Sequence, residues 1–420
     1  MLDRACAALR DRDARLAELP PKPDRSAAQQ ATAAELLAGA HALRDAVLAE
    51  HAAAVYAEVT GDLAEELWLD DVVDRTAERF PGLVPGARQL TVELRRPQRD
   101  KDGLETAQAL FCSHVLANPR SGEHLLGAMA RPRPESAALA ELMREADSAD
   151  LGPVGVRRDG DIGHVILQNH DNLNAEDDES TAALETAVDW VLRDDRVQVG
   201  VLRGAPATHP KWTPRRVFGS GINLTRLAEG RISLLGFFLR RELGPVDKMY
   251  RGHAAGGVRR EKPWIAAVDG FAIGGACQLL LVMDRVIAER GAYLTLPASR
   301  EGIVPGCGPL RLPRFVGEAV AREALLFERR FDVDGADGAR LVGEVVATED
   351  MDAAIAAAAY RLLECGMTSV RANRRALREA AEPLEVFRRY LATYAREQAA
   401  CLYSPELIRN LERGWVSRVR

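Results

Sequence analysis

This 420-residue sequence lacks long apolar runs, a signal-like leader and any excess of positive charge. No stretch approaches the roughly 18 apolar residues of a membrane-spanning helix. The N-terminal stretch MLDRACAALRDRDARLAEL is charged throughout, without the apolar centre of a signal peptide. The net charge of −6 gives no bulk attraction for nucleic acid or an anionic membrane. We therefore expect a cytoplasmic protein that has neither of these as a partner.

Cysteine and histidine are also scarce. The six cysteines form no CxxC pair, and the eight histidines form neither HExxH nor His-x-His. These spacings argue against a disulfide framework and against a zinc cluster. We expect a reducing compartment and no metal held by the protein.

The first part of the chain has the composition and periodicity of helices. Hydrophobic residues make up 47% of the sequence and charged residues 28%, which is typical of a globular protein with a large core. Apolar residues recur at helical spacing over 26–59, and further helices are expected near 104–117 and 135–147. We predict an N-terminal helical domain over 1–150 that packs on the rest or mediates oligomerisation.

From residue 153 onward, strands and helices alternate. Two β-rich runs flank Asp159-Gly160 and predict a hairpin. The following elements are expected to be helices at 176–193 and 232–242 and strands at 197–204, 264–268 and 285–289. This alternation predicts an α/β core over 151–335. The Ala-, Arg- and Leu-rich end predicts a C-terminal helical region over 336–420.

Two glycine turns stand where a strand gives way to a helix. In VDGFAIGGACQLLLVMD (268–284), Gly274-Gly275 precedes an apolar stretch that begins at Gln278. A glycine turn at a helix start exposes backbone N–H groups that stabilise an anion. VFGSGINL (217–224) is a second such turn and offers the N–H of Ile222. If the turns converge on one carbonyl oxygen, they form an oxyanion hole, each donor contributing about 3 kcal/mol to transition-state stabilisation.

A third segment, LTLPASREGIVPGCGPLRLPRFVG (294–317), follows the next strand. In this order and spacing, the three segments resemble the crotonase (enoyl-CoA hydratase/isomerase) superfamily over roughly 153–350. ILQNHDNLNAEDDES and DGARLVGEVVA extend the match. The resemblance implies a spiral of ββα units, an acyl-CoA thioester substrate, and Ile222 and Gly275 as the oxyanion-hole donors. It also implies a homo-oligomer, a trimer or a hexamer.

Two positions depart from the hydratase pattern. Hydratases of this superfamily have glutamates at the positions of Gln278 and Ala298, and those carboxylates perform acid–base work on water. An amide and a methyl group cannot shuttle a proton, so we do not expect hydration of an enoyl-CoA. Gln278 can still donate and accept hydrogen bonds, which suits a substrate hydroxyl.

The resemblance is fuller to one branch of the superfamily, the cofactor-independent dioxygenases that act on 3,5-dihydroxyphenylacetyl-CoA in dihydroxyphenylglycine and antibiotic biosynthesis. It rests on the N-terminal helical region, HPKWTPRRVFGSGINL, FFLRRELG and EKPWIAAVDGFAIGGACQLLLVMD. It implies that an enolate reduces O₂, and that a peroxide expels CoA to leave 3,5-dihydroxyphenylglyoxylate. No metal, flavin or haem is implied, and O₂ is the co-substrate.

The resemblance also implies roles for individual residues. Glu176, Arg241 and Gln278 are candidates for contacting the ring hydroxyls, with Arg240 as a rival of Arg241. The apolar walls that admit O₂ are expected to include Ile222, Leu224 and Ile303. The turn residues expected beside the substrate are Gly221, Asn223, Ala276 and Cys277. The residues expected to bind CoA are His170, His209, Lys211, Trp212 and Arg215, and Arg216 lies in the same basic loop.

Two other interpretations stay open. The chain could be another enolate-forming acyl-CoA isomerase or thioester hydrolase of this fold, or a non-catalytic scaffold. The intact glycine turns argue against a scaffold, and the glutamine in place of a glutamate favours the dioxygenase over the isomerase or hydrolase. The base that removes the α-proton is not identified by the sequence.

Overall fold

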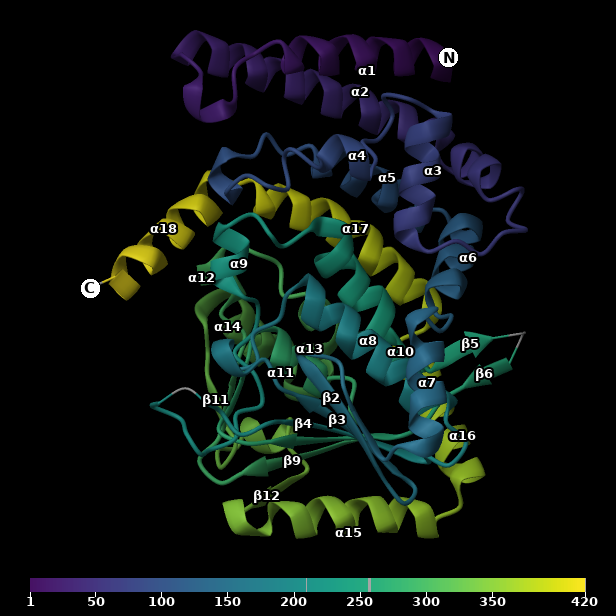
Figure 1. Cartoon of the computed structure of the whole chain (residues 1–420), viewed down its shortest axis with the longest axis vertical. Coiled ribbons are helices and arrows are strands. Elements are labelled where there is room, and N and C mark those ends of the chain that lie inside the picture. The colour runs from purple at the N-terminus through teal and green to yellow at the C-terminus, as the bar shows by residue number, and fades with distance from the viewer. Residues whose placement is uncertain (209, 256–257, 420) are drawn as a thin grey trace.

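A seven-stranded sheet forms the centre of the molecule in the computed structural model, which describes residues 1–208, 210–255 and 258–419 (Figure 1). Its strand order is β1-β2-β3-β4-β7-β9-β12. The strands are β1 (Ser148–Asp150), β2 (Val154–Asp159), β3 (Ile162–Leu167), β4 (Val199–Gly204), β7 (Trp264–Val268), β9 (Arg285–Glu289) and β12 (Glu344–Val346). β1 to β3 are antiparallel and β3 to β12 are parallel.

The predicted hairpin forms between β2 and β3, where Gly160 adopts a φ of +56° that favours glycine. Two small sheets complete the strands. One has the order β11 (Phe331–Asp332), β10 (Tyr293–Thr295), β8 (Phe271–Ile273), and the other joins β5 (His253–Ala255) to β6 (Val258–Arg260).

Helices cover both faces of the large sheet. α8 (Asp178–Arg193) packs on β2 and β3, and α15 (Met351–Glu364) packs on β4, β7 and β9 from the other side (Figure 1). Every residue of β7 is buried, as expected for a parallel strand covered on both faces. The predicted α/β core with helical regions before and after it is confirmed.

Residues before the sheet form seven α-helices: α1 (Leu2–Ala17), α2 (Ala27–Val59), α3 (Leu69–Arg79), α4 (Ala87–Leu90), α5 (Glu105–Ala117), α6 (Pro119–Met129) and α7 (Glu135–Glu145). α2 begins where the sequence predicts it, because the Ser26 hydroxyl accepts from the Gln29 N–H while the Gln29 side chain accepts from the Ser26 N–H. Among the described residues, no helix combines the length and the apolar character needed to cross a membrane.

The remaining helices within the core are short: α9 (Leu224–Ala228), α10 (Asp247–Arg251), α11 (Gly275–Leu280), α12 (Ala298–Glu301), α13 (Gly308–Val316) and α14 (Glu318–Phe327). Two π-helical segments are η4 (Leu234–Leu239) and η5 (Glu242–Val246). The 3₁₀ turns are η1 (Lys22–Asp24), η2 (Gln98–Asp100), η3 (His170–Asn172), η6 (Gly338–Arg340) and η7 (Thr348–Asp350).

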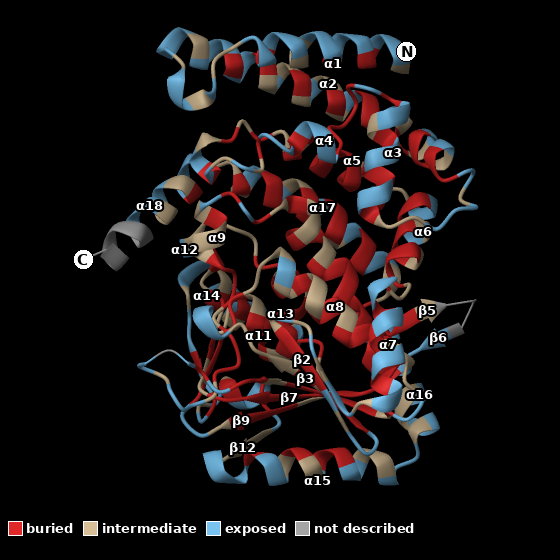
Figure 2. Ribbon diagram, viewed as in Figure 1, coloured by how far each residue is buried: buried red, intermediate tan, exposed pale blue. Residues whose placement is uncertain are grey.

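The last helices return to the first ones. After α16 (Met367–Ala381), α17 (Leu384–Leu402) packs against α5 and α6, and α18 (Pro405–Val419) then packs against α9 and α12 (Figure 1). A single cluster of buried residues includes Val55 of α2, Phe111 of α5, Phe238 of η4 and Leu391 of α17. The two ends of the chain therefore share one apolar core, which appears as the buried surfaces between these helices in Figure 2.

Four predicted segments differ from the structure. The helix expected over 176–193 begins at Asp178, because the Asp177 carboxylate accepts from the Ser180 N–H and caps it. The helix expected over 232–242 begins at Leu234, is π-helical in part, and is followed across a kink at Gly244 by helical backbone up to Arg251. The segment 336–420, expected to be helical, contributes β12 to the main sheet beside β9, and the helical segment 1–150 ends in β1.

Candidate active site

The two glycine turns meet at one place. Ile273 donates to the Gly219 carbonyl, and Gly274 donates to the Thr295 carbonyl. Gly221 and Gly274 both have positive φ values, +83° and +55°. A Cβ on Gly221 would lie 2.9 Å from the Ile273 carbonyl oxygen, so only glycine allows this approach of the two turns. The predicted convergence of the turns is therefore present in the structure.

The N–H groups of Ile222 and Gly275 lie in these turns and take no part in the bonds that join them. The Glu176 N–H donates to the Gly221 carbonyl, and the Asn223 N–H donates to the Glu176 carbonyl. This bridge uses the residues on either side of Ile222 but not the Ile222 N–H. Gly275 is the first residue of α11, where backbone N–H groups have no partner within the helix. The pair fits the predicted role as oxyanion donors.

Glycine at position 275 leaves room for a neighbouring carboxylate. A Cβ there would lie 1.6 Å from Glu176 Oε2 and 3.1 Å from Arg241 Nη2. Glu176 Oε2 is buried and has no hydrogen-bond partner among the described residues. The structure therefore places one acceptor oxygen of Glu176 directly against the start of α11.

Arg241 is the centre of a buried polar network. Its Nη2 donates to Glu176 Oε1 (3.0 Å) and to the Gly275 carbonyl (2.7 Å), and its Nη1 donates to Glu242 Oε1 (2.6 Å) and Gln278 Oε1 (3.2 Å). Burial alone would lower the pKa of Arg241, but the Glu176 and Glu242 carboxylates raise it. Arg241 is thus a fixed cation that orients the side chains of Glu176, Glu242 and Gln278.

Arg240 turns away from this network. Its Nε donates to Glu185 Oε2 (2.7 Å), and Glu185 also pairs with the fully buried Lys248. The rival of Arg241 therefore belongs to a separate ion cluster beneath α8.

Glu242 is a buried member of the site that the sequence did not single out. Its Oε2 accepts from the Cys307 N–H (3.2 Å), which ties it to the turn before α13. A Cβ on Gly306 would lie 2.3 Å from both Glu242 Oε1 and Gln278 Oε1, and Gly306 has a φ of +44°. The PGCG segment therefore needs glycine at 306 to close over these two side chains.

The network faces a cavity of about 30 Å³. Of the predicted residues, those that line it are Glu176, Ile222, Arg241, Gly275, Gln278 and Ile303. Lining residues that the sequence did not suggest are Phe237, Phe238, Glu242, Glu301, Val304, Pro305, Gly306 and Tyr394. This volume suits one or two small molecules such as water or O₂. An aromatic ring would therefore need the surrounding side chains to move apart.

The π-helical segments explain why adjacent residues reach the same cavity. Phe238 donates to the Ser233 carbonyl five residues earlier, which is the π-helical pattern. Phe237 and Phe238, and likewise Arg241 and Glu242, all line the cavity. A regular α-helix turns 100° per residue, so its periodicity alone would predict only one residue of each pair here.

Four of the turn residues expected near the substrate take part in helix capping and packing. Asn223 caps α9 by accepting from the Arg226 N–H (3.1 Å), and Leu224 packs against the cluster of the helical layer. Ala276 and Cys277 are buried in the core beneath the sheet, and burial raises the pKa of the Cys277 thiol to about 12. These four residues and Gly221 are not among the described residues that line the 30 Å³ cavity.

Of the residues predicted to bind CoA, Trp212 lies against β8 and His170 begins the turn η3. The Trp212 ring packs edge-on against Phe271 with centroids 5.1 Å apart, and Lys211 Nζ lies 5.6 Å from the centre of the Trp212 ring. His170 and Arg215 are exposed. His209 lies outside the described residues. Trp212 is therefore anchored at the base of this basic loop, and its role toward CoA stays a prediction.

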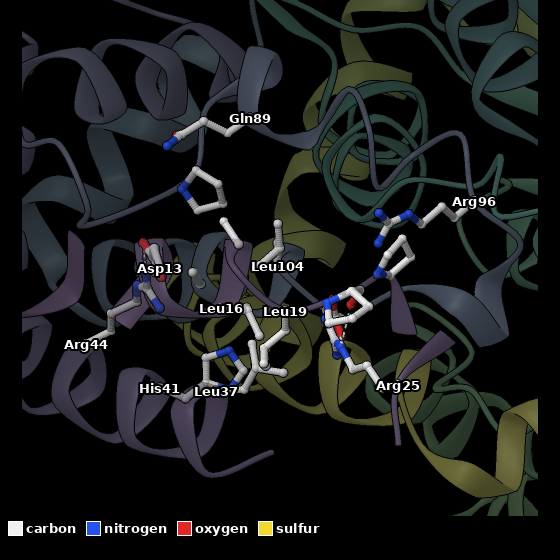
Figure 3. A pocket seen from close by; sticks show the side chains of 16 residues that line it. Asp13, Leu16, Leu19, Arg25, Leu37, His41, Arg44, Gln89, Arg96 and Leu104 are labelled. Atoms are coloured by element: carbon white, nitrogen blue, oxygen red, sulfur yellow. Dashed lines mark hydrogen bonds and ion pairs between the residues drawn. The ribbon is translucent and has the colours of Figure 1, made fainter. Parts of the chain in front are cut away.

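A larger cavity of about 440 Å³ lies within the N-terminal helices (Figure 3). It shares no lining residue with the smaller one. Its most buried cations already have partners, since Arg25 pairs with Asp102 (2.6 Å) and Arg44 with Asp13 (2.8 Å). These pairs join α2 and its preceding turn to the rest of the helical layer.

Over the described part of the chain, no three His, Cys, Asp or Glu side chains are grouped to hold a metal ion.

Comparison with known proteins agrees with this geometry. The chain is 42% identical over 394 residues to a (3,5-dihydroxyphenyl)acetyl-CoA 1,2-dioxygenase of Amycolatopsis orientalis, covering 93% of this chain and 90% of that protein. It is 39% identical to a crotonyl-CoA hydratase of Syntrophomonas wolfei over 28% of this chain and 46% of that enzyme.

A solved enoyl-CoA hydratase/isomerase from Xanthobacter autotrophicus Py2 shares the fold, with a TM-score of 0.54 and 24% identity over 63% of this chain and 93% of the other. The model of the enoyl-CoA hydratase/isomerase family matches residues 157–399. The resemblance predicted from the glycine turns is thus confirmed, and the chain belongs to the enoyl-CoA hydratase/isomerase family.

Proposed function

We propose that this protein is a cofactor-independent dioxygenase that converts 3,5-dihydroxyphenylacetyl-CoA and O₂ to 3,5-dihydroxyphenylglyoxylate and CoA. The observation that carries the proposal is the pair of converging glycine turns with an amide at Gln278 and a methyl group at Ala298. The turns suit a thioester enolate, while the missing carboxylates remove the groups that would activate water. The similarity to the Amycolatopsis dioxygenase across nearly the whole chain supports the same reaction.

The first step forms the enolate. A base takes one α-proton, the C–H electron pair becomes the carbon–carbon double bond, and the thioester oxygen becomes negative. The Ile222 and Gly275 N–H groups then donate to that oxygen. The buried site strengthens these hydrogen bonds because little water competes for the donors.

The second step is electron transfer to O₂. The enolate gives one electron to O₂, the two radicals combine at the α-carbon, and a peroxide anion results. The peroxide attacks the thioester carbonyl and expels CoA as its thiolate. The second α-hydrogen then leaves as a proton, its electron pair forms the keto group, and the O–O bond breaks toward the carboxylate. Both atoms of O₂ enter the product, and the substrate itself supplies every electron.

Glu176, Arg241 and Gln278 are proposed to orient the dihydroxyphenyl ring. Glu176 Oε2 is an unused acceptor for one ring hydroxyl. The Gln278 side-chain carbonyl accepts from Arg241. The amide NH₂ of Gln278 can then donate to a hydroxyl oxygen. The apolar side chains Phe237, Phe238 and Ile303 would exclude water around the enolate.

The test is oxygen consumption by purified, EDTA-treated protein given 3,5-dihydroxyphenylacetyl-CoA, with free thiol followed in parallel. Equal amounts of O₂ consumed and CoA released are expected. Thiol release without oxygen uptake would indicate the thioester hydrolase. If neither oxygen uptake nor thiol release is observed, the result would contradict the dioxygenase and favour the scaffold.

A further inference from the structure

Three carboxylates line the 30 Å³ cavity, and they differ in their partners. Glu176 and Glu242 each accept hydrogen bonds from Arg241. Glu301 lines the same cavity, and the hydrogen bonds of the described residues include none to its carboxylate. A carboxylate held by a guanidinium is a weak base, because the cation stabilises its ionised form. Glu301 is the lining carboxylate without such a partner.

The position of Glu301 on its helix is also informative. α12 spans Ala298–Glu301, so Glu301 lies three residues after Ala298 and on the same face of the helix. Ala298 lines the cavity as well and carries only a methyl group. One turn of helix therefore brings a carboxylate to the same side of the cavity where position 298 supplies none.

From this placement we propose that Glu301 is the general base that removes the α-proton of the bound acyl-CoA. This inference rests on the proposed function, because it assigns the base of its first step. The Glu301 carboxylate takes the proton and becomes the neutral acid, while the C–H electron pair forms the enolate held by Ile222 and Gly275. The same group can accept the second α-proton after the first has been released to solvent.

The electrostatic surroundings suit a base that works near neutral pH. Burial, together with the nearby Glu328 carboxylate, raises the pKa of Glu301 to about 7, although Arg300 partly opposes the shift. Arg300 also pairs with Glu328 at 3.7 Å. About half of the molecules of such a base are ionised at neutral pH, and the ionised form still binds a proton well.

The elements packed against α12 add few other charges. α14 presents Glu328 at its C-terminal end, and α18 presents the uncharged Leu407 and Asn410, with the exposed pair Glu406–Arg409 beside them. Across the cavity lie Glu176 and Glu242, whose two carboxylates share the single guanidinium of Arg241.

The decisive experiment measures exchange of the α-protons of 3,5-dihydroxyphenylacetyl-CoA in D₂O without oxygen, by mass spectrometry. The wild type is expected to exchange them, and Glu301→Gln is expected to lose the exchange by about 100-fold or more. Glu301→Asp keeps a carboxylate and should retain a measurable part of it. A Glu301→Gln variant that folds, binds the substrate and exchanges at the wild-type rate would overturn the proposal.

A matched variant tests the pH dependence. The base is active when ionised, so the exchange rate should rise with pH through about 7 and then level off. Glu328→Gln removes a like charge, so the rise should move to lower pH while the upper plateau is unchanged. An unmoved rise would overturn the assignment to Glu301. Exchange that the wild type shows and Glu301→Gln loses, without oxygen uptake in air, would contradict the dioxygenase but support Glu301 as the base.

Discussion

At the scale of residues, the site depends on atoms that are absent. Gly275 has no Cβ, and the space is taken by the Glu176 carboxylate. Ala298 has no carboxylate, and Gln278 has an amide where a hydratase has an acid. Each absence removes water chemistry or allows a backbone N–H to approach the substrate. The substitutions that restore the missing atoms are therefore the most informative ones.

Gly275→Ala keeps the backbone N–H but should move it or the Glu176 carboxylate, and it is expected to lower oxygenation by up to roughly 10²–10³-fold, the range typical of a lost oxyanion donor. Its new Cβ would lie 1.6 Å from Glu176 Oε2 and would displace either the carboxylate or the turn. Gly127→Ala is the matched control, because a Cβ on this helical glycine meets nothing within 4 Å. The measurement is kcat/KM for oxygen uptake, and equal values for the two variants would refute the role of Gly275.

Gln278→Glu is expected to impair oxygenation at least tenfold, since it places a third carboxylate around Arg241 beside Glu176 and Glu242. The added charge would compete for the guanidinium and repel an enolate. Oxygen uptake and substrate binding should be measured together. Unchanged turnover would remove Gln278 from the site.

At the scale of elements, the structure shows what local sequence patterns can and cannot predict. The glycine turns were identifiable because φ above zero and a close backbone approach both require glycine at fixed positions. Choosing Arg241 over Arg240 required the resemblance, because the π-helical segments shift the helical phase that periodicity assumes. Glu301 carried a usable signal, its three-residue spacing from Ala298, whereas nothing local marked Tyr394 of α17.

The junction of α16 and α17 is fixed by one buried carboxylate. Glu382 is fully buried and pairs with Arg311 (3.0 Å), Arg314 (2.7 Å) and Arg251 (2.8 Å). Burial alone would raise the pKa of Glu382, but these guanidiniums lower it to about 2. A lowered pKa contributes stability that is present above the ordinary value of about 4.5 and is lost as the pH falls toward 2.

Glu382→Gln should therefore lower the free energy of unfolding at pH 7 by about 3 kcal/mol and flatten its dependence on pH between about 4.5 and 2. Urea unfolding at several pH values measures both effects. The exposed Glu379, three residues earlier on the chain, gives the control variant Glu379→Gln. If both variants lose stability equally, the buried ion cluster is not the cause.

At the scale of the whole molecule, the N-terminal helices and α17 form one layer, on the face of the sheet away from α15 (Figure 1). The Arg388 guanidinium of α17 donates to the Ala117 carbonyl at the end of α5 (2.7 Å), and Phe387 and Leu391 are fully buried in the shared cluster. Because α17 also brings Tyr394 to the cavity, the helical layer belongs to the active site. This docking joins residues 271 positions apart, which is why helical periodicity alone did not predict it.

Deleting residues 1–150 should consequently abolish oxygen uptake and remove the cooperative thermal transition, because α17 would lose its buried partner. Circular dichroism melting and the oxygen electrode test this. A truncated chain with the wild-type Tm and activity would show that the helical layer is dispensable. The trimer or hexamer implied by the family resemblance stays a prediction, for which sedimentation equilibrium is the measurement.

The central claim is that the substrate itself reduces O₂ and keeps both oxygen atoms. In the most direct measurement, the EDTA-treated protein is given ¹⁸O₂ and 3,5-dihydroxyphenylacetyl-CoA, and the reaction is quenched promptly. The mass of the arylglyoxylate is then determined by mass spectrometry. The proposed steps predict two labelled oxygens, one in the keto group and one in the carboxylate. An unlabelled arylacetate, or a product labelled only when the water carries ¹⁸O, would contradict the claim and indicate hydrolysis of the thioester instead.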